Sequence, residues 1–277
     1  MYKVDMTYEE FLKKEQEKYP ELKLNDIESL KERVKANTEL PYVRDKLIIL
    51  FLHGSYFDVD IAYKTIVIHY KYRKDLPQVF ANYDPTTAGI KKVFNSMSIC
   101  LLPNIYTDKH ERFIYTNFKN PDPREYDFIQ SVRYFFMMLE YMLETNGSFD
   151  GLVVTLNSLG MNWRHITMTP MNTMKKLLGF VQDALPVRLK EVHVLNAGSM
   201  MSVLFNIIKP FMRSGLMSIL KLHPEGSKDI FNHVPIELLP TEIGGTGKSH
   251  YEYSEDTLNE MVSVRDWLFS LDSELCQ

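Results

Sequence analysis

The sequence predicts an α/β protein in which a small helical region precedes a layer of parallel strands and helices. Residues 1–88 carry only helix-type spacing of apolar side chains, whereas from residue 89 onward short β-type runs alternate with amphipathic helices. The composition, 45% hydrophobic and 25% charged in 277 residues, is typical of a globular protein. We therefore expect a helical N-terminal domain at 1–88 and an α/β domain at 89–277.

The N-terminal region has start and stop signals for several helices. Pro20 stops the first helix, and Asn25 can cap a second one that ends before Pro41. The next run, 45–53, is apolar on most faces, which is typical of a buried helix. Helices are accordingly expected at 7–18, 25–40, 45–53 and 61–74.

The second region alternates between the two periodicities. A Thr169–Pro170 pair gives the cap and first turn of one helix, and a long apolar helix from residue 200 contains Pro210. Strands are expected at 112–117, 151–156 and 192–195, with an edge strand at 235–239. The accompanying helices are expected at 127–143, 169–184, 200–220 and 254–271.

Charge and cysteine content exclude several classes of protein. With 32 Lys and Arg against 36 Asp and Glu, the net charge of −4 predicts no nucleic-acid partner. Only Cys100 and Cys276 are present, too few for a disulfide framework or a cysteine zinc site. The first twenty residues lack the apolar core of a secretory signal, and the longest uncharged stretch, 192–208, is shorter than the roughly 20 residues of a membrane span. A monomeric, cytoplasmic protein is expected.

Glycines at 244, 245 and 247 precede Lys248 and Ser249, as in a phosphate-binding loop. That motif also requires a glycine where this chain has Glu242, and a helix directly afterwards. The histidines lack the spacing of metal ligands on a helix, and His193 fits a buried strand residue. The serines lack the strained turn of a hydrolase nucleophile. No catalytic residue, metal site or cofactor is predicted. An enzyme that uses the glycine cluster is kept as a hypothesis, and it is the least favoured one.

The predicted helix at 200–220 carries an unusually wide apolar stripe. Its apolar residues include Met200, Leu204, Ile207, Ile208 and Phe211, at helical spacing. The proline in its middle removes one helical hydrogen bond and favours a hinge. Of the 15 methionines, 11 lie between 137 and 217, where they suit irregular apolar space. The helix is either ordinary core or a mobile cover over something apolar.

Three segments resemble the CRAL-TRIO lipid-binding family. They are QDALPVRLKEVHVLN at 182–196, IIKPFM at 207–212 and LPTEIGG at 239–245, and the upstream run 50–62 is similar to the family's N-terminal helical domain. The branch that these segments resemble most holds the alpha-tocopherol transfer and cellular retinaldehyde-binding proteins. The resemblance implies a helical N-terminal domain, a pocket floored by mostly parallel strands, and a movable gate helix containing Lys209–Pro210–Phe211. It also implies that the glycine cluster is a family motif and that the protein is not an enzyme.

The resemblance further implies which residues bind the ligand, with ordinary core packing as the alternative for each. Arg188 and Lys190 match positions that hold phosphoinositide headgroups, but Gly215 and Ile219 stand where relatives carry further basic residues. The expected function is an intracellular carrier that exchanges a tocopherol-, retinoid-, carotenoid- or terpenoid-like lipid with anionic membranes by transient contact. The alternative is a phosphoinositide- or phospholipid-binding signalling module. The expected pocket residues are Tyr134, Met138, Val154, Leu156, Met168, Leu177, Phe180, Val181, Leu185, Val187, Leu189, Val192, Val203, Leu204, Ile207, Ile208 and Phe211.

Overall fold

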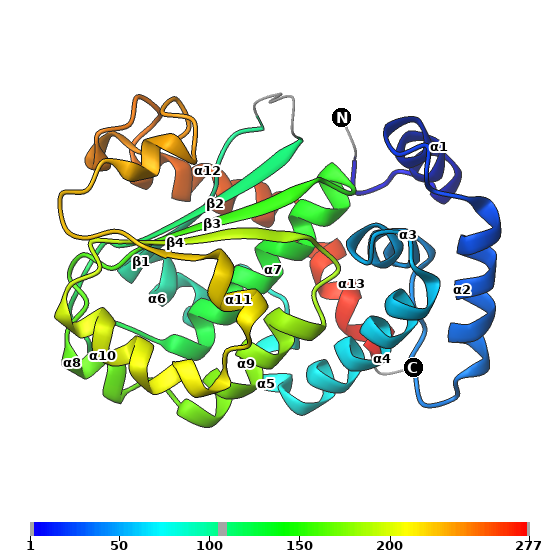
Figure 1. Ribbon diagram of the computed structural model, residues 1–277, viewed down its shortest axis with the longest axis horizontal. Helices are drawn as coiled ribbons and strands as arrows, with labels where there is room; N and C mark the ends of the chain where they lie inside the picture. The colour runs from blue at the N-terminus through cyan, green and yellow to red at the C-terminus, as the bar shows by residue number, and fades with distance from the viewer. Residues whose placement is uncertain (1–2, 105–109, 276–277) are drawn as a thin grey trace.

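A five-stranded sheet forms the centre of the computed structural model, which describes residues 3–104 and 110–275 (Figure 1). The strands lie in sequence order, and β2 to β5 run parallel to one another, as predicted. β1 pairs with β2 in the antiparallel sense. The strands are β1 Met97–Leu101, β2 Glu111–Phe118, β3 Gly151–Asn157, β4 Leu189–Leu195 and β5 Leu220–Leu222.

Helices cover both faces of the sheet and extend beyond one end of it (Figure 1). One face is covered by α6, α7 and α9, the opposite face by α12, and α1 to α4 form the N-terminal group beside the sheet. The N-terminal helices are α1 Tyr8–Lys18, α2 Leu24–Ala36, α3 Asp45–Gly54, α4 Val59–Asp75 and α5 Pro77–Phe80. The later helices are α6 Ala88–Ser96, α7 Phe128–Asn146, α8 Trp163–Thr167, α9 Met171–Asp183, α10 Ser199–Ile208, α11 Ser214–Ile219, α12 His250–Ser263 and α13 Arg265–Leu275.

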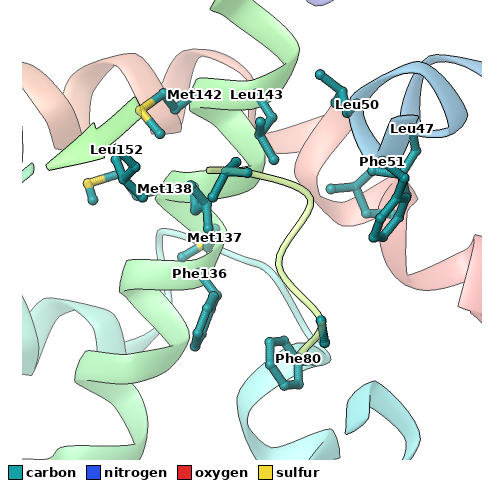
Figure 2. Packing of buried hydrophobic residues seen from close by; sticks show 14 of the residues in the cluster. Leu47, Leu50, Phe51, Phe80, Phe136, Met137, Met138, Met142, Leu143 and Leu152 are labelled. Atoms are coloured by element: carbon teal, nitrogen blue, oxygen red, sulfur yellow. The ribbon is translucent and has the colours of Figure 1, made fainter. Parts of the chain in front are cut away.

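Side chains alternate between two hydrophobic cores on either side of the sheet. Leu152 and Val154 of β3 join the larger core with α7, whereas Val153 between them joins the smaller core beside α12. Figure 2 shows α7 side chains packing toward Leu152, with Phe80 and the α3 residues Leu50 and Phe51 nearby. The larger core therefore continues from the sheet layer into the N-terminal helices without a break.

The predicted helix at 200–220 is wrong in its middle and at its end. The chain instead forms α10, a single 3₁₀ turn at Lys209–Phe211, and α11. Pro210 cannot donate a backbone hydrogen bond, so the α-helix ends there. Leu220, expected at the helix end, begins β5, a three-residue strand that the sequence did not reveal.

The predicted edge strand at 235–239 is also wrong. This segment is a series of turns in which Leu238 N–H donates to the carbonyl of Pro235 at 3.0 Å. Leu238 and Leu239 are buried in the smaller core, which accounts for the strand-like apolar pattern. A Cβ on Gly245 would lie 2.0 Å from the carbonyl oxygen of Leu239, so glycine is required there for close packing. The glycine cluster thus packs against residues 235–239.

Candidate functional site

A cavity of about 340 Å³ lies between helices α7 to α10 and the sheet face that α6, α7 and α9 cover. β1, β3 and β4 supply Ile99, Leu156 and Val194 as its floor. The first half of α7 and most of α9 form its walls. The remaining lining residues are Met97, Thr116, Phe118, Tyr126, Phe128, Ser131, Val132, Phe135, Phe136, Asn157, Ser158, Met161, His165, Ile166, Thr169, Met174, Leu177, Leu178, Val181, Met201 and Leu204.

Most polar groups in this wall already form hydrogen bonds with other groups of the protein. Asn157 accepts hydrogen bonds from Leu159 N–H at 3.1 Å and Asn196 Nδ2 at 2.8 Å, and it donates to Tyr115 Oη at 3.1 Å. Ser158 Oγ lies 2.8 Å from the carbonyl oxygen of Leu195. These bonds fix the carboxyl end of β3 against the segment that leads into α10. They leave the cavity wall chemically apolar.

His165 is the exception. Its Nδ1 accepts a hydrogen bond from Asn162 N–H at 3.1 Å, so the ring proton is on Nε2. Nε2 is buried and has no hydrogen-bond partner among the residues that the structure describes. Burial lowers the pKa of His165, which keeps the imidazole neutral at pH 7. The cavity-lining residue His165 thus carries one buried N–H without a hydrogen-bond partner in the part of the chain that the structure describes.

α10 covers the cavity as a loosely packed helix. It carries no charge and seven of its ten residues are apolar, yet none of its residues is buried along its fully described length. Met201 and Leu204 line the cavity, whereas Val203 and Ile207 are each 37% exposed. Exposing such a helix to water costs free energy, so apolar matter on either side of it would stabilise it.

The far end of this cover is fastened to α9. Gln182 Nε2 donates to the carbonyl oxygen of Phe211 at 3.1 Å, and its Oε1 accepts from Arg213 N–H at 2.6 Å. Arg213 also forms an ion pair with Asp183. The Lys175 ammonium lies 5.4 Å from the centre of the Phe211 ring. α10 is thus held mainly at its end, by polar contacts that are partly exposed to solvent.

The structure brings only some of the expected pocket residues together. Leu156, Leu177, Val181 and Leu204 line the cavity. Five others are buried outside its lining: Tyr134, Met138, Val154, Phe180 and Val187. Leu185, Leu189 and Val192 are partly buried outside it, as are Ile208 and Phe211 at the end of the cover, whereas Met168, Val203 and Ile207 are exposed.

Several lining residues were not among those expected. Met97 and Ile99 belong to β1, a strand that the sequence did not reveal. Phe128, Val132 and Phe135 come from α7, where apolar spacing predicted an inward face without distinguishing cavity from core. His165, whose chemistry suggested from the sequence that it could orient a hydroxyl or carbonyl of the ligand, is among the lining residues.

The two expected headgroup residues lie outside the cavity lining. Arg188 Nε donates to the carbonyl oxygen of His53 at 3.0 Å, and its guanidinium lies 4.1 Å from the centre of the Tyr56 ring. Lys190 forms an ion pair with Glu111. Both cations lie near the start of β4, where their partners belong to α3, the turn after it and β2. The positive charge of Lys190 is partly neutralised there.

The loop that resembled a phosphate site shows different contacts. The ammonium of Lys248 lies 2.5 Å from the carboxylate of Asp256, and Ser249 caps α12 through a capping box with Glu252.

No helix within residues 3–104 and 110–275 is long and apolar enough to cross a membrane.

Comparison with known proteins gives two matching family models. The model described as "CRAL/TRIO domain" matches residues 96–245, more than half of the chain, and "Pinta-like, UBA domain" matches residues 19–90. Alpha-tocopherol transfer protein-like of Mus musculus is 28% identical over 242 residues, which cover 84% of this chain and 68% of that protein. The Homo sapiens protein of the same name has the same identity and coverage.

Two further similarities extend the comparison. Clavesin-2 of Mus musculus is 23% identical over 271 residues, covering 92% of this chain and 82% of that protein. The crystal structure of Sfh5 superimposes with a TM-score of 0.54 at 12% identity, covering 84% of this chain and 92% of that one. At that identity the structural likeness concerns the fold alone.

Proposed function

Because the chain belongs to the CRAL/TRIO family, we propose that it is a carrier that encloses a small hydrophobic lipid beneath α10 and exchanges it with membranes. Binding and transfer of lipophilic ligands is typical of this family. One observation carries the proposal: a wall of apolar side chains surrounds a cavity whose cover is an apolar helix without a buried residue along its described length. In this proposal residues 89–277 form the lipid-binding domain, and 1–88 form its helical companion.

The cavity suits a molecule of lipid size. Its volume of about 340 Å³ falls within the usual range for small-molecule sites. Burying about 400 Å² of apolar ligand surface contributes roughly 10 kcal/mol before association costs, at about 25 cal/mol per Å². After those costs, micromolar to nanomolar affinity is expected. Enclosure also makes release into water slow, because the ligand must expose its apolar surface.

The wall favours a ligand with one polar end. We infer that a rotation of the His165 side chain would present its buried, unpaired Nε2–H to the ligand. Beside a pure hydrocarbon this N–H would remain unsatisfied, at a cost of about 1–3 kcal/mol. A hydroxyl or carbonyl oxygen on the ligand would accept its proton. A tocopherol, a retinoid or an oxygenated carotenoid or terpenoid therefore suits the site better than a hydrocarbon.

Exposed apolar residues provide a surface for membrane contact. Leu159 and Trp163 are 57% and 53% exposed on the β3–α8 connection and α8, which lies beside α10 (Figure 1). Val203 and Ile207 add apolar area on α10. Tryptophan and aliphatic side chains on a short helix can enter the interface of a bilayer. Contact there would let α10 swing open with its apolar face in lipid rather than in water.

Arg188 and Lys190 support the alternative of a phosphoinositide-binding signalling module. A headgroup would have to compete with Glu111 for Lys190, whereas Arg188 keeps a cationic face stacked on Tyr56. In the carrier proposal these two residues contribute about 1 kcal/mol each toward an anionic membrane.

Mass spectrometry of organic extracts from the chain purified from its own source tissue tests the proposal. We expect one apolar molecule with a terminal oxygen at about one equivalent. Transfer of that molecule between vesicles should fall sharply in Phe211→Asp, whose fold is checked by circular dichroism. An extract without lipid would exclude the carrier. Normal transfer by the variant would show that the assigned gate is wrong. An extract of phosphoinositide alone would favour the signalling module.

A further inference from the structure

A cluster of histidines and carboxylates occupies the sheet face opposite the cavity. Val194 of β4 lines the cavity, so Glu191 and His193, at odd positions of the same strand, face the other side. His233 reaches them from the turn that follows the 3₁₀ turn Asp229–Asn232. This cluster serves no part of the proposed lipid transfer. Its donors instead have the chemistry of a metal site.

We propose that Glu191, His193 and His233 form a binding site for Zn²⁺. Glu191 Oε2 lies 3.0 Å from His193 Nε2 and 3.2 Å from His233 Nδ1, and the three ligand atoms all fall within 4.8 Å of one another. Zinc bonds of about 2.0–2.2 Å in a tetrahedron place ligand atoms about 3.4 Å apart. Two imidazoles and one carboxylate are a donor set that zinc uses, with water as the fourth ligand.

Partners behind the ligands favour the same arrangement. His193 Nδ1 lies 2.9 Å from His223 Nε2, so the ring nitrogen that would not bind metal is held by a neighbour. Asp229 lies behind both other rings, with its Oδ2 3.5 Å from His223 Nδ1 and 3.6 Å from His233 Nε2. Such outer contacts orient imidazole ligands and raise their basicity.

An ion could reach the cluster from solvent. His193 is fully buried, but the side chains of Glu191 and His233 are 20% and 21% exposed. Lys221 occupies the cluster in the absence of metal: its ammonium lies 2.9 Å from Glu191 Oε1 and 3.2 Å from His233 Nδ1. This cation balances the carboxylate in the absence of metal. It is 34% exposed on a flexible stem, so it can turn outward when Zn²⁺ binds.

Titration of the whole chain with ZnCl₂ by calorimetry, in metal-free buffer, tests the site. Wild type should bind one equivalent with micromolar or tighter affinity. His233→Asn should weaken binding at least about tenfold, the smallest effect expected when part of a metal site is removed. His110→Asn, at an exposed histidine outside the cluster, should leave binding unchanged.

Lys221→Gln separates this site from adventitious binding by surface histidines. Removing a cation a few ångströms from a divalent ion should tighten binding by about tenfold or more, even with water-like screening. Circular dichroism verifies that each variant is folded, and both substituted side chains are partly exposed. Absence of saturable binding in wild type and Lys221→Gln would overturn the proposal. Equal binding by wild type and His233→Asn would also overturn it.

Discussion

Two ends of the same helical layer differ in how completely they are filled. Both are built on α7 and α9 beneath the sheet. At one end the N-terminal helices close the layer, and the rings of Phe80 and Phe180 pack with centroids 4.6 Å apart. Phe136, which also borders the cavity, packs against both rings with centroids 5.0 and 5.1 Å away. At the other end the cover is α10, and a cavity of about 340 Å³ remains. The difference shows that the covering element, rather than the sheet, decides which end is solid.

Polar contacts strengthen the solid end. Arg73 of α4 lies 2.5 Å from Glu140 of α7, and Arg44 lies 3.2 Å from Glu144 one helical turn further along. These ion pairs are largely buried. Each charge is therefore neutralised by a partner in the core, where an unpaired charge would be destabilising. At the cavity end, the partly exposed side chains of Gln182 and Asp183 bind the end of the cover, and the Lys175 ammonium lies over the Phe211 ring.

The largest expected effect is at the solid end. Phe180→Ala should lower the free energy of unfolding by about 3–5 kcal/mol, because it leaves a hole among closely packed rings. Denaturant unfolding measures the loss. Phe269→Ala, at a ring that is 57% exposed, is the control and should change stability by about 0.5 kcal/mol or less. A loss below about 1 kcal/mol at Phe180 would show that this end is also loosely packed.

Acid should weaken the solid end through His69. Its Nδ1 donates to the carbonyl oxygen of Ala184 at 2.9 Å, and burial lowers its pKa from 6.5 to about 3. Below pH 6.5 the unfolded chain takes up a proton that the folded chain refuses, so stability falls as pH falls toward 3. The contribution lost between pH 7 and pH 5 is about 2 kcal/mol.

Unfolding curves at both pH values measure this loss. The His69→Gln variant should lose correspondingly less stability between them, whereas the exposed His110→Asn variant should behave as wild type. Parallel pH dependence in wild type and His69→Gln would contradict a buried neutral imidazole at this position.

The cover should tolerate a change that a core would not. Leu204→Ala should cost about 1 kcal/mol of stability or less, compared with the 2–5 kcal/mol typical of a buried leucine, because Leu204 packs on a cavity and is only partly buried. The same substitution should weaken binding of the apolar fluorophore diphenylhexatriene. A core-sized loss of stability would mean that α10 is an ordinary core helix.

The smallest effect is expected at the fastening between α9 and Arg213. Arg213→Ala should change stability by at most about 1 kcal/mol, since the ion pair with Asp183 is partly exposed. Stopped-flow release of diphenylhexatriene should nevertheless quicken up to about fivefold, which corresponds to that energy. Arg33→Ala breaks an exposed pair with Asp60 far from α10 and serves as the matched control. Equal release rates in the two variants would rule out a fastening role.

Much of the fold followed from periodicity, because long amphipathic helices and buried parallel strands have strong patterns. β1 was missed because it follows α6 without a turn residue between them, and β5 because three residues carry no usable pattern. The turns at 235–239 resembled a strand because the segment is rich in apolar residues, of which Leu238 and Leu239 are buried in the smaller core.

The cavity was harder to predict than the fold. On a helix, one residue changes direction by about 100°, so neighbouring positions face different surroundings. Val181 lines the cavity whereas Phe180 is buried outside its lining, and Phe135 lines it whereas Tyr134 does not. Apolar spacing identifies the inward side of α7 and α9. It does not distinguish a solid interior from a hollow one, since both require the same side chains.

Fluorescence titration with diphenylhexatriene most directly tests whether the space beneath α10 receives an apolar guest. Wild type and Val262→Trp, which enlarges an exposed side chain on α12, should each bind one equivalent of the fluorophore. Val181→Trp, which fills the cavity from α9, should bind none while remaining folded. Undiminished binding by folded Val181→Trp, or no binding by wild type, would contradict the account.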